Sequence, residues 1–327
     1  MIDKQHILSF ALLLGSLLAV GCSSSDDELT GASAPITFGT LVTRAAVNAD
    51  KTNMEDFLVW GGFDNENNLF NAESVTKDGS YTGTRYWVPG KEHNFYALHP
   101  AGLTVGTTDK VAQHVECNNN GVITVTDFNT SLKRGTDAID LMTASITNIT
   151  YNVGETPSSV DLTFSHELSR VKFTISTDAK VTITDVKLWG INFKGDFTTQ
   201  ADAATPWSKL TTADESNTPF SQPDDFELEA NGKRHLLAGT YDADNDNYGD
   251  LLFIPQAITN EVIFTMSWTY ADGSIRGVKV PLNQAGPDQW EKGKSYHYQA
   301  TIPSPTTDIT FTVKVTDWND YRIDAVL

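Results

Sequence analysis

Carboxylate side chains stand at alternate positions in one short stretch of the chain, a spacing that could bind calcium. The carboxylates are Asp242, Asp244 and Asp246. Calcium prefers oxygen ligands, and an EF-hand loop places them at alternate positions, with glycine sixth and a bidentate glutamate twelfth. This sequence has Asn247 and Phe253 at those two positions, so it departs from the motif where the turn and the bidentate ligand are set. We expect an Asp- and Asn-rich hairpin loop here, with calcium binding as the alternative.

Groups that could catalyse a reaction are scattered through the rest of the chain. Of the seven histidines, no two have the spacing of a metal site on a helix and none lies beside a cysteine. The motifs of zinc proteases, serine hydrolases, dinucleotide-binding domains and P-loop enzymes do not occur in the sequence. Carboxylate pairs are abundant in so acidic a chain, and they therefore do not indicate glycoside hydrolysis. We expect a protein that is not an enzyme and that needs no cofactor.

Some single residues call for a structural interpretation instead. The sequence contains 2 cysteines, too few for a disulfide framework, and we expect Cys117 to be structural rather than catalytic. His166 follows a predicted strand, and we expect it to hold a hydrogen bond in the fold. The 7 tryptophans could stack on sugars, but in a protein built from sheets they more often fill cores.

The length and charge of the chain limit the class of protein to which it can belong. The 327 residues carry 23 Lys and Arg against 42 Asp and Glu, a net charge of −19. So acidic a surface repels phosphate backbones and anionic headgroups, and we expect no nucleic-acid partner. With 39% hydrophobic residues the chain can bury cores, and its length predicts about two domains.

The N-terminus has the composition of a lipoprotein signal peptide. Lys4 precedes the apolar run 7–20, which is shorter than the roughly 20 residues that cross a bilayer. Residues 19–22 resemble a bacterial lipobox, although Ala19 stands where leucine is favoured. The resemblance implies removal of residues 1–21 and acylation of Cys22, which would attach the chain to outer-membrane lipid. An ordinary signal peptide with a chance cysteine is the alternative.

A polar tether follows Cys22. Residues 22–35 contain serine and glycine, which are typical of flexible linkers. Their acidic segment 25–28 resembles the export signal of surface-exposed lipoproteins, and serine after Cys22 resembles an outer-membrane sorting signal. We therefore expect a lipid-anchored protein of the cell outer membrane that faces the surface. A solvated acidic linker is the alternative interpretation of the segment.

From residue 36 onward the sequence predicts an all-β protein. Apolar and polar residues alternate over short stretches that end at Gly, Asn, Asp or Pro, which is typical of sandwiches and partly closed barrels. We expect residues 201–225 to be a long loop, and the strand 309–315 to lie near the centre of its sheet with Val315 facing the core. The domains are placed at 36–176 and 177–327. The clearest strand candidates are 122–126, 160–164, 171–175, 181–186, 262–270, 277–281, 296–302 and 309–315.

Several short segments, taken in their order along the chain, also resemble a known protein family. They are 36–46 (ITFGTLVTRAA), 86–89 (YWVP), 94–100 (NFYALHP), 164–173 (FSHELSRVKF), 251–256 (LLFIPQ), 290–298 (WEKGKSYHY) and 315–318 (VTDW). Together they resemble the fimbrillin family, the type V pilin-like outer-membrane lipoproteins. The resemblance implies two transthyretin-like β-sandwich domains and a structural or accessory subunit of a surface fimbria (pilus).

The same resemblance implies how such a subunit assembles and supports adhesion. An Arg-directed protease would cut between Arg44 and Ala45 and remove the strand 36–42. The C-terminal segment of another fimbrial subunit, with Tyr321, Ile323, Ala325 and Leu327 on one face, would then replace that strand. An uncut edge strand and a last strand of the chain's own fold are the alternatives for these two segments. A surface lipoprotein that does not polymerise, and binds a glycan or a host protein, is the alternative function.

Overall fold

Strands dominate the structure of this chain. The computed structural model describes residues 34–42, 55–106, 110–200, 206–222, 224–238, 250–303 and 310–317. Within these ranges no helix is long and apolar enough to cross a membrane. All eight strands predicted from the alternation are present, with ends shifted by a few residues. The helical segments are α1 (Leu282–Ala285) and the 3-10 turns η1 (Ala101–Thr104) and η2 (Gly135–Asp137).

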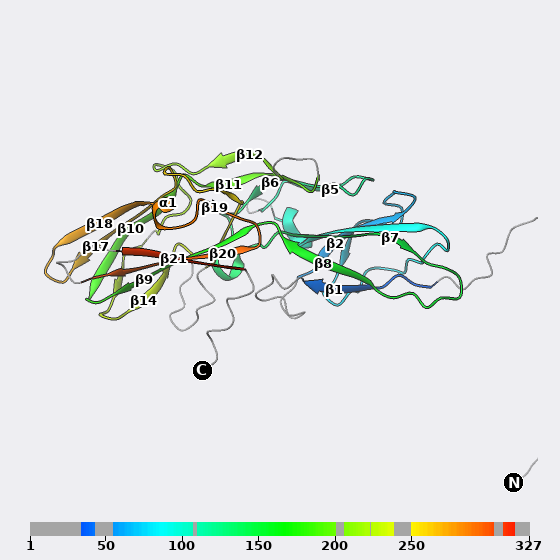
Figure 1. Ribbon diagram of the computed structural model, residues 1–327, viewed down its shortest axis with the longest axis horizontal. Helices are drawn as coiled ribbons and strands as arrows, with labels where there is room; N and C mark the ends of the chain where they lie inside the picture. Colours follow the sequence, from blue (N-terminus) through cyan, green and yellow to red (C-terminus); the bar gives the residue numbers. More distant parts are fainter. Residues whose placement is uncertain are drawn as a thin grey trace, which may run out of the picture. The chain divides into compact units, whose positions relative to one another are not determined.

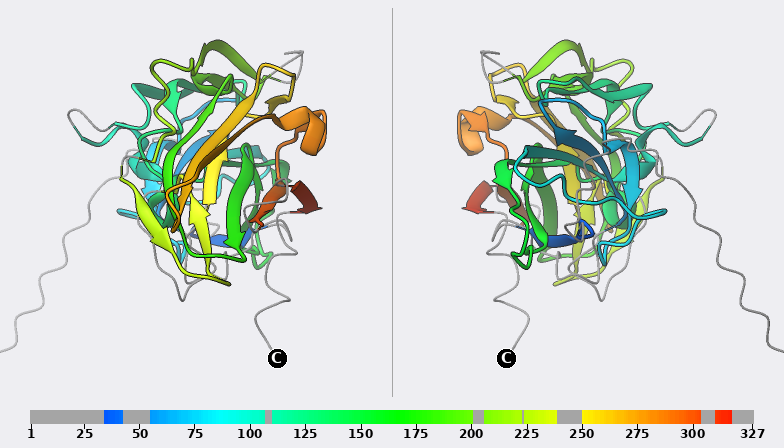
Figure 2. Two further views of the ribbon diagram at one scale, coloured as in Figure 1. Left: turned by 90° about the vertical axis from the view of Figure 1, so that its left-hand side faces the viewer. Right: turned by 90° about the vertical axis from the view of Figure 1, so that its right-hand side faces the viewer.

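The first sheet, which we call the N-terminal sheet, has six strands in the order β1-β8-β7-β4-β2-β3. β8 reads VDLTFSH, and its residues are alternately buried and exposed, as a strand with one face on a core requires. β1 pairs with β8 in parallel, and it lies low in both views of Figure 2, at the margin of the described strands. The strands are β1 (Phe38–Val42), β8 (Val160–His166), β7 (Met142–Thr150), β4 (Glu92–His99), β2 (Phe57–Phe63) and β3 (Phe70–Val75).

A four-stranded sheet, here the bridging sheet, joins early and late parts of the sequence in the order β12-β11-β6-β5. Phe197 of the late part pairs with Val125 of the early part, and Trp207 packs on Phe128 and Phe197. Both segments therefore contribute to one apolar cluster. The strands are β12 (Trp207–Thr212), β11 (Asn192–Thr198), β6 (Ile123–Asn129) and β5 (His114–Cys117).

The third sheet is the β9 sheet, in the order β14-β9-β20-β21, with β15 also paired to β9. β9 and β20 run parallel, and almost every residue of β9 is buried because both of its faces are covered. The strands are β14 (Lys233–Leu236), β9 (Ser169–Thr177), β20 (Lys294–Ile302), β21 (Thr310–Asp317) and β15 (Asp250–Phe253).

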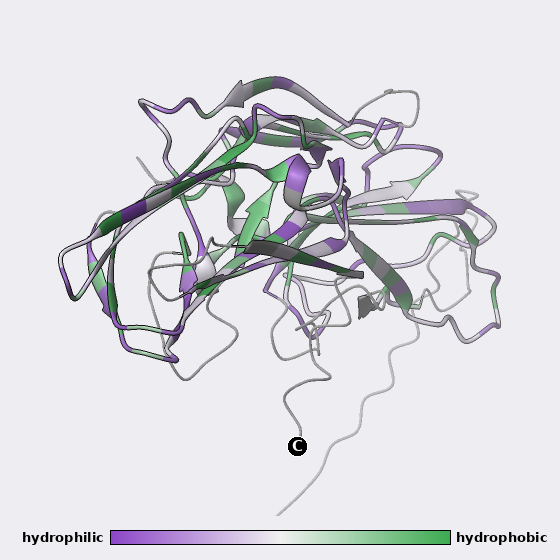
Figure 3. Ribbon diagram, turned by 60° about the vertical axis from the view of Figure 1, so that its left-hand side comes forward, coloured by the Kyte–Doolittle hydropathy of each residue, from purple (hydrophilic) through white to green (hydrophobic). Residues whose placement is uncertain are grey.

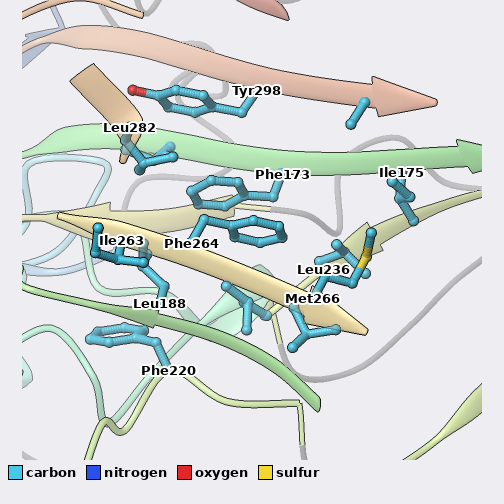
Figure 4. Close-up of a cluster of buried hydrophobic side chains, with 14 of the residues drawn as sticks. Phe173, Ile175, Leu188, Phe220, Leu236, Ile263, Phe264, Met266, Leu282 and Tyr298 are labelled. Carbon is cyan, nitrogen blue, oxygen red and sulfur yellow. The ribbon is translucent and has the colours of Figure 1, made fainter. Parts of the chain in front are cut away.

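The fourth sheet is the β10 sheet, in the order β13-β10-β17-β18. Its inner side chains meet those of the β9 sheet, where the rings of Phe173 and Phe264 stack with centroids 5.2 Å apart (Figure 4). Green and purple segments alternate along many of the strands in Figure 3, as alternating burial demands. The strands are β13 (Phe226–Leu228), β10 (Val181–Trp189), β17 (Ile263–Tyr270) and β18 (Ile275–Pro281), beside the small pair β16 (Gln256–Ala257) and β19 (Gln289–Trp290).

Two expectations about strands are wrong. Residues 201–225 are not all loop, because β12 forms at 207–212. Only Trp207 of this strand is buried, so its sequence shows no alternation of apolar and polar residues from which a strand could be predicted. The strand 309–315 is not near the centre of a sheet, because β21 pairs only with β20 among the described strands. Val315 is accordingly 46% exposed rather than in the core. Both strands lie at sheet edges, where one face need not be apolar.

The chain passes from the N-terminal sheet to the β9 sheet between β8 and β9. The expected boundary at residues 176 and 177 falls on the last two residues of β9. Buried side chains form separate clusters before and after this region, and a third cluster includes residues from both sides. A division into domains at 36–176 and 177–327 stays a prediction.

Candidate functional site at strand β1

Strand β1 is the element that the sequence singled out, and its position in the sheet is distinctive. It is the end strand of the N-terminal sheet, it pairs with residues 160–164, and the rings that pack against Phe38 are those of Phe70, Tyr81 and Phe95. Phe38 is paired with Val160 and Val42 with Phe164 along the parallel ladder. In Figure 1 β1 (blue) runs beside β8 (green). The strand is thus held by a part of the fold that is remote in sequence.

Two side chains at the start of this segment are part of the core: Phe38 in β1, and Ile36, which lies two residues before the strand. Ile36 is 1% exposed and Phe38 is 6% exposed. The Phe38 ring makes edge-on contacts with three aromatic rings, with centroid distances of 5.2 Å to Phe70, 5.9 Å to Tyr81 and 5.8 Å to Phe95. We call these three rings the Phe38 cage. Such edge-on pairs add to the free energy gained by burying the ring.

Residues 76–87, which we call the strap, contact the start of β1 and the residues just before it. The main-chain N–H of Ile36 donates to the carbonyl of Arg85 over 2.8 Å, and the Trp87 N–H donates to the Ala34 carbonyl over 3.0 Å. The Tyr81 hydroxyl donates to the carbonyl of Ile36 over 2.8 Å. The residues just before the strand are therefore bonded through their main chain, in a way that does not depend on their side chains.

Gly79 brings the strap against the strand. Its φ is +87°, in the region that favours glycine, and a Cβ there would lie 2.1 Å from the Phe38 carbonyl oxygen. The turn TKDGS that contains it is held by a 2.8 Å hydrogen bond from the Thr76 N–H to the Ser80 carbonyl. Sequence reasoning did not identify the strap, although this Asp-Gly turn was the available signal.

On the C-terminal side of β1, Glu55 is the first residue that the structure describes again, and its main chain is bonded to a buried histidine. The Glu55 N–H donates to Nε2 of His99 over 3.2 Å, and Nδ1 of His99 lies 3.1 Å from the Asp140 carbonyl. A ring that accepts at Nε2 must carry its proton on Nδ1, so His99 is neutral here. Burial lowers the pKa of His99, and the carboxylates of Asp140 and Glu55 oppose that effect.

His166 is buried beside a carboxylate of the fold. Its Nδ1 lies 2.6 Å from a carboxylate oxygen of Asp140, and its side chain is almost fully buried. The next residue, Glu167, accepts a 2.7 Å hydrogen bond from Thr143 and lies 3.1 Å from the ammonium of Lys292. These polar contacts tie the end of β8 to the N-terminal sheet and to the segment before β20.

Most of the individual site residues inferred from the sequence lie outside the described residues. This holds for Cys22, for Arg44 and Ala45, for Asp242, Asp244 and Asp246, and for Tyr321, Ile323, Ala325 and Leu327. Lipid attachment, cleavage, strand donation and calcium binding at these positions stay predictions. The structure instead describes β1, the strand that cleavage would remove, and its surroundings.

The residues considered for other chemistry are parts of the core. Burial raises the pKa of the Cys117 thiol to about 12, so it is neutral at physiological pH. Trp60, Trp87, Trp189, Trp207, Trp268 and Trp290 are buried, as expected of core tryptophans. Trp318 lies outside the described residues. In the part of the chain that the structure describes, no three His, Cys, Asp or Glu residues are grouped so that they could hold a metal ion.

Comparison with known proteins gives a family and a fold. Residues 43–318 match the protein family described as Fimbrillin-like. A fimbrial protein from Bacteroides vulgatus ATCC 8482 has a similar structure, with a TM-score of 0.55 and 18% identity over 87% of this chain and 99% of that chain. A candidate cell adhesion protein from Bacteroides ovatus ATCC 8483 gives a TM-score of 0.53 and 16% identity over 88% of this chain and 98% of that chain. No curated protein sequence matches the chain.

Proposed function

Because the chain belongs to the fimbrillin-like family, we propose that it is a structural or accessory subunit of a surface fimbria that assembles by exchange of strand β1. The family resemblance inferred from the sequence motifs is thereby confirmed. The subunit would be built as two transthyretin-like sandwiches and anchored in the outer membrane through acylated Cys22. Its fimbria would support adhesion, and the anchor would be lost from copies that are cut after Arg44.

The position of β1 is the observation that carries this proposal. Within the described residues, every other strand of the N-terminal sheet begins at or after Phe57. A cut between Arg44 and Ala45 would therefore separate β1 from the rest of its sheet without interrupting another described strand. The Glu55 N–H, bonded to His99, would hold the chain beyond the cut.

Removal of β1 would expose a surface that favours a replacement. Val160, Leu162 and Phe164 of β8 are at most 1% exposed, and each faces the core beside β1. The main-chain groups of β8 that now pair with β1 would also lose their partners. An apolar groove with a row of unpaired main-chain groups is a template for an added strand.

The C-terminal segment of another copy is the replacement we propose. Residues 321–327 alternate as Tyr321, Ile323, Ala325 and Leu327 on one face, which matches the spacing of inward positions in a strand. They follow β21, an edge strand of the β9 sheet. A groove in one copy and a strand from the next form a heterologous contact. Such a contact builds a fibre unless the rotation between copies closes them into a ring.

Two variants of the full chain test this function. Arg44→Ala should prevent processing and leave a lipidated monomer, whereas deletion of 321–327 should give protein that is cut but does not polymerise. Polymer would be followed as ladders of surface protein on gels run without boiling. Lys51→Ala, which removes a nearby basic residue, is the control for processing. Polymers that persist in both variants would exclude strand exchange.

A further inference from the structure

The β9 sheet has one face on the core and a second face that is polar. Phe173 and Tyr298 belong to the buried cluster between the β9 sheet and the β10 sheet (Figure 4), so the residues next to them along the strands turn the other way. Paired residues of neighbouring strands share a face, and the pairing places Lys233 beside Ser176 and Ser176 beside Thr301. These three residues form a polar row across β14, β9 and β20.

A second polar row lies beside the first and completes a groove. It consists of Thr174, Gln299 and Thr312, which are paired across β9, β20 and β21. The two rows, together with Ala300 and Pro303, line a groove of about 640 Å³. Sites that hold small molecules have volumes of roughly 300–1,000 Å³, so the groove is large enough for a ligand of one or two sugar units.

Hydrogen bonds hold several side chains of the groove in place. Thr174 is buried, and its hydroxyl oxygen lies 2.8 Å from Nδ1 of His235 and 2.6 Å from Nε2 of His297. A hydroxyl has one proton, so it can donate to one of these rings while it accepts from the other. The hydroxyls of Ser176 and Thr301 are also bonded to each other, over 2.8 Å. A ligand would therefore meet hydroxyl groups that are already ordered.

The charge of this face is opposite in sign to that of the whole chain. Among its described residues, the basic side chains of Arg170, Lys172, Lys233 and Lys314 outnumber the carboxylates. The carboxylate of Asp250 lies beside Arg170 and 3.7 Å from the ammonium of Lys172. Lys233 lines the groove itself. In a chain with a net charge of −19, this face is suited to attract a negatively charged ligand.

We propose that the groove binds a sugar acid, a saccharide unit that carries one carboxylate. The Lys233 ammonium would bind the carboxylate through a charge-assisted hydrogen bond. Gln299, Thr301 and Thr312 would bind the sugar hydroxyls, because amides and hydroxyls both donate and accept. The described residues that line the groove include neither a carboxylate, which would repel an acid, nor an aromatic ring, on which a neutral sugar would stack. The net charge of −19 disfavours a polyanion such as a nucleic acid.

Ligand-observed NMR with the full chain tests the class of ligand. The acidic probes are 3′-sialyllactose and cellobiouronic acid, and their neutral counterparts are lactose and cellobiose. At least one acidic probe should bind about tenfold more tightly than its counterpart, and inorganic phosphate should not displace it. Failure of both acidic probes, equal binding of the neutral sugars, or displacement by phosphate would overturn the proposal. Binding should be unchanged in the Arg44→Ala chain, so this result is independent of whether the subunit polymerises.

Two variants test whether the groove is the site. Lys233→Gln should weaken binding of the acidic probe about tenfold and leave the neutral sugars unaffected. Lys187→Gln, which removes the same charge from β10, is the matched control and should bind as the wild type does. Thr312→Val, at an exposed residue, removes one hydroxyl and should weaken the acidic probe a few-fold. Thermal unfolding confirms that each variant is folded. Wild-type binding by both Lys233→Gln and Thr312→Val, or equal losses in Lys233→Gln and Lys187→Gln, would exclude the groove.

Discussion

The hydroxyl of Tyr81 donates a 2.8 Å hydrogen bond to the main-chain carbonyl of Ile36, and the Tyr81 ring packs edge-on against Phe38. One residue of the strap thus contacts both the backbone and a side chain of the strand that we propose to be exchanged. The Tyr81 hydroxyl also accepts a 3.2 Å hydrogen bond from the Arg85 N–H, which fixes its orientation.

Tyr81→Phe should loosen β1 without disturbing the cage. The variant keeps the ring and removes one hydrogen bond, so the free energy of unfolding should fall by about 1 kcal/mol. After cleavage at Arg44, β1 should also leave faster. Urea unfolding and the rate of β1 release measure the two effects. Tyr86→Phe is the matched control, because Tyr86 is 49% exposed. An unchanged release rate in Tyr81→Phe would mean that the strap does not restrain the strand.

Phe38→Ala should destabilise the uncut chain strongly. The ring fills a closed aromatic cluster, and removing it leaves a cavity that costs roughly 3–5 kcal/mol. Ile275→Ala, at a residue that is 69% exposed, should change the free energy of unfolding by less than about 0.5 kcal/mol. Comparable losses in the two variants would show that Phe38 does not occupy the core.

Acid should destabilise the fold through its buried histidines. Burial lowers the pKa of both His93 and His99 below the ordinary value of 6.5. Below pH 6.5 the unfolded chain therefore binds more protons than the folded chain, so the free energy of unfolding falls as the pH drops below that value. Above it this contribution is fully present.

NMR titration of the imidazole rings measures the same effect directly. Both rings accept an N–H at Nε2, His93 from Val88 and His99 from Glu55, so both should titrate below pH 6.5. A pKa of His99 at or above the ordinary value of 6.5 would contradict the neutral, buried ring.

Cys117 should be inert in the folded chain. Burial raises its pKa from 9.0 to about 12, so almost no thiolate is present at pH 8. In a Cys22→Ser protein, iodoacetamide at pH 8 should label Cys117 only after denaturation, as followed by mass spectrometry. Rapid labelling of the native protein would show that the thiol is accessible and ionises readily.

The sequence allowed us to predict where most strands lie along the chain, but not which strands pair with one another. Alternation in VDLTFSH identifies a half-buried strand directly, because each second residue faces the core. The partners of a strand depend on residues far away, which is why the parallel pairing of β1 with β8 could not be inferred. β12 escaped prediction for a different reason: it buries Trp207 alone and exposes its other residues.

The candidate site was found only in part for a similar reason. The sequence singled out the strand 36–42, and two of its apolar residues, Ile36 and Phe38, are in the core. The strap binds the segment before β1 mainly through main-chain hydrogen bonds, which do not require particular residue types and so cannot be predicted from the sequence. Only Gly79 carries a sequence signal, since its positive φ and close approach to Phe38 require glycine.

Two residues, Glu167 and Leu168, separate β8 of the N-terminal sheet from β9 of the β9 sheet. In a fibre made by strand exchange, tension from the next copy would enter along β8 and continue through the covalent chain into β9, then across to β20 and β21. In each of these strand pairs the tension acts parallel to the strands. The hydrogen bonds of a pair therefore share the load and must break together instead of one by one. The β20–β21 pairing extends over the 8 residues of β21, whereas β1 is 5 residues long. The exchanged strand would therefore be the mechanical weak point, and a stretched fibre should part between subunits before either subunit unravels.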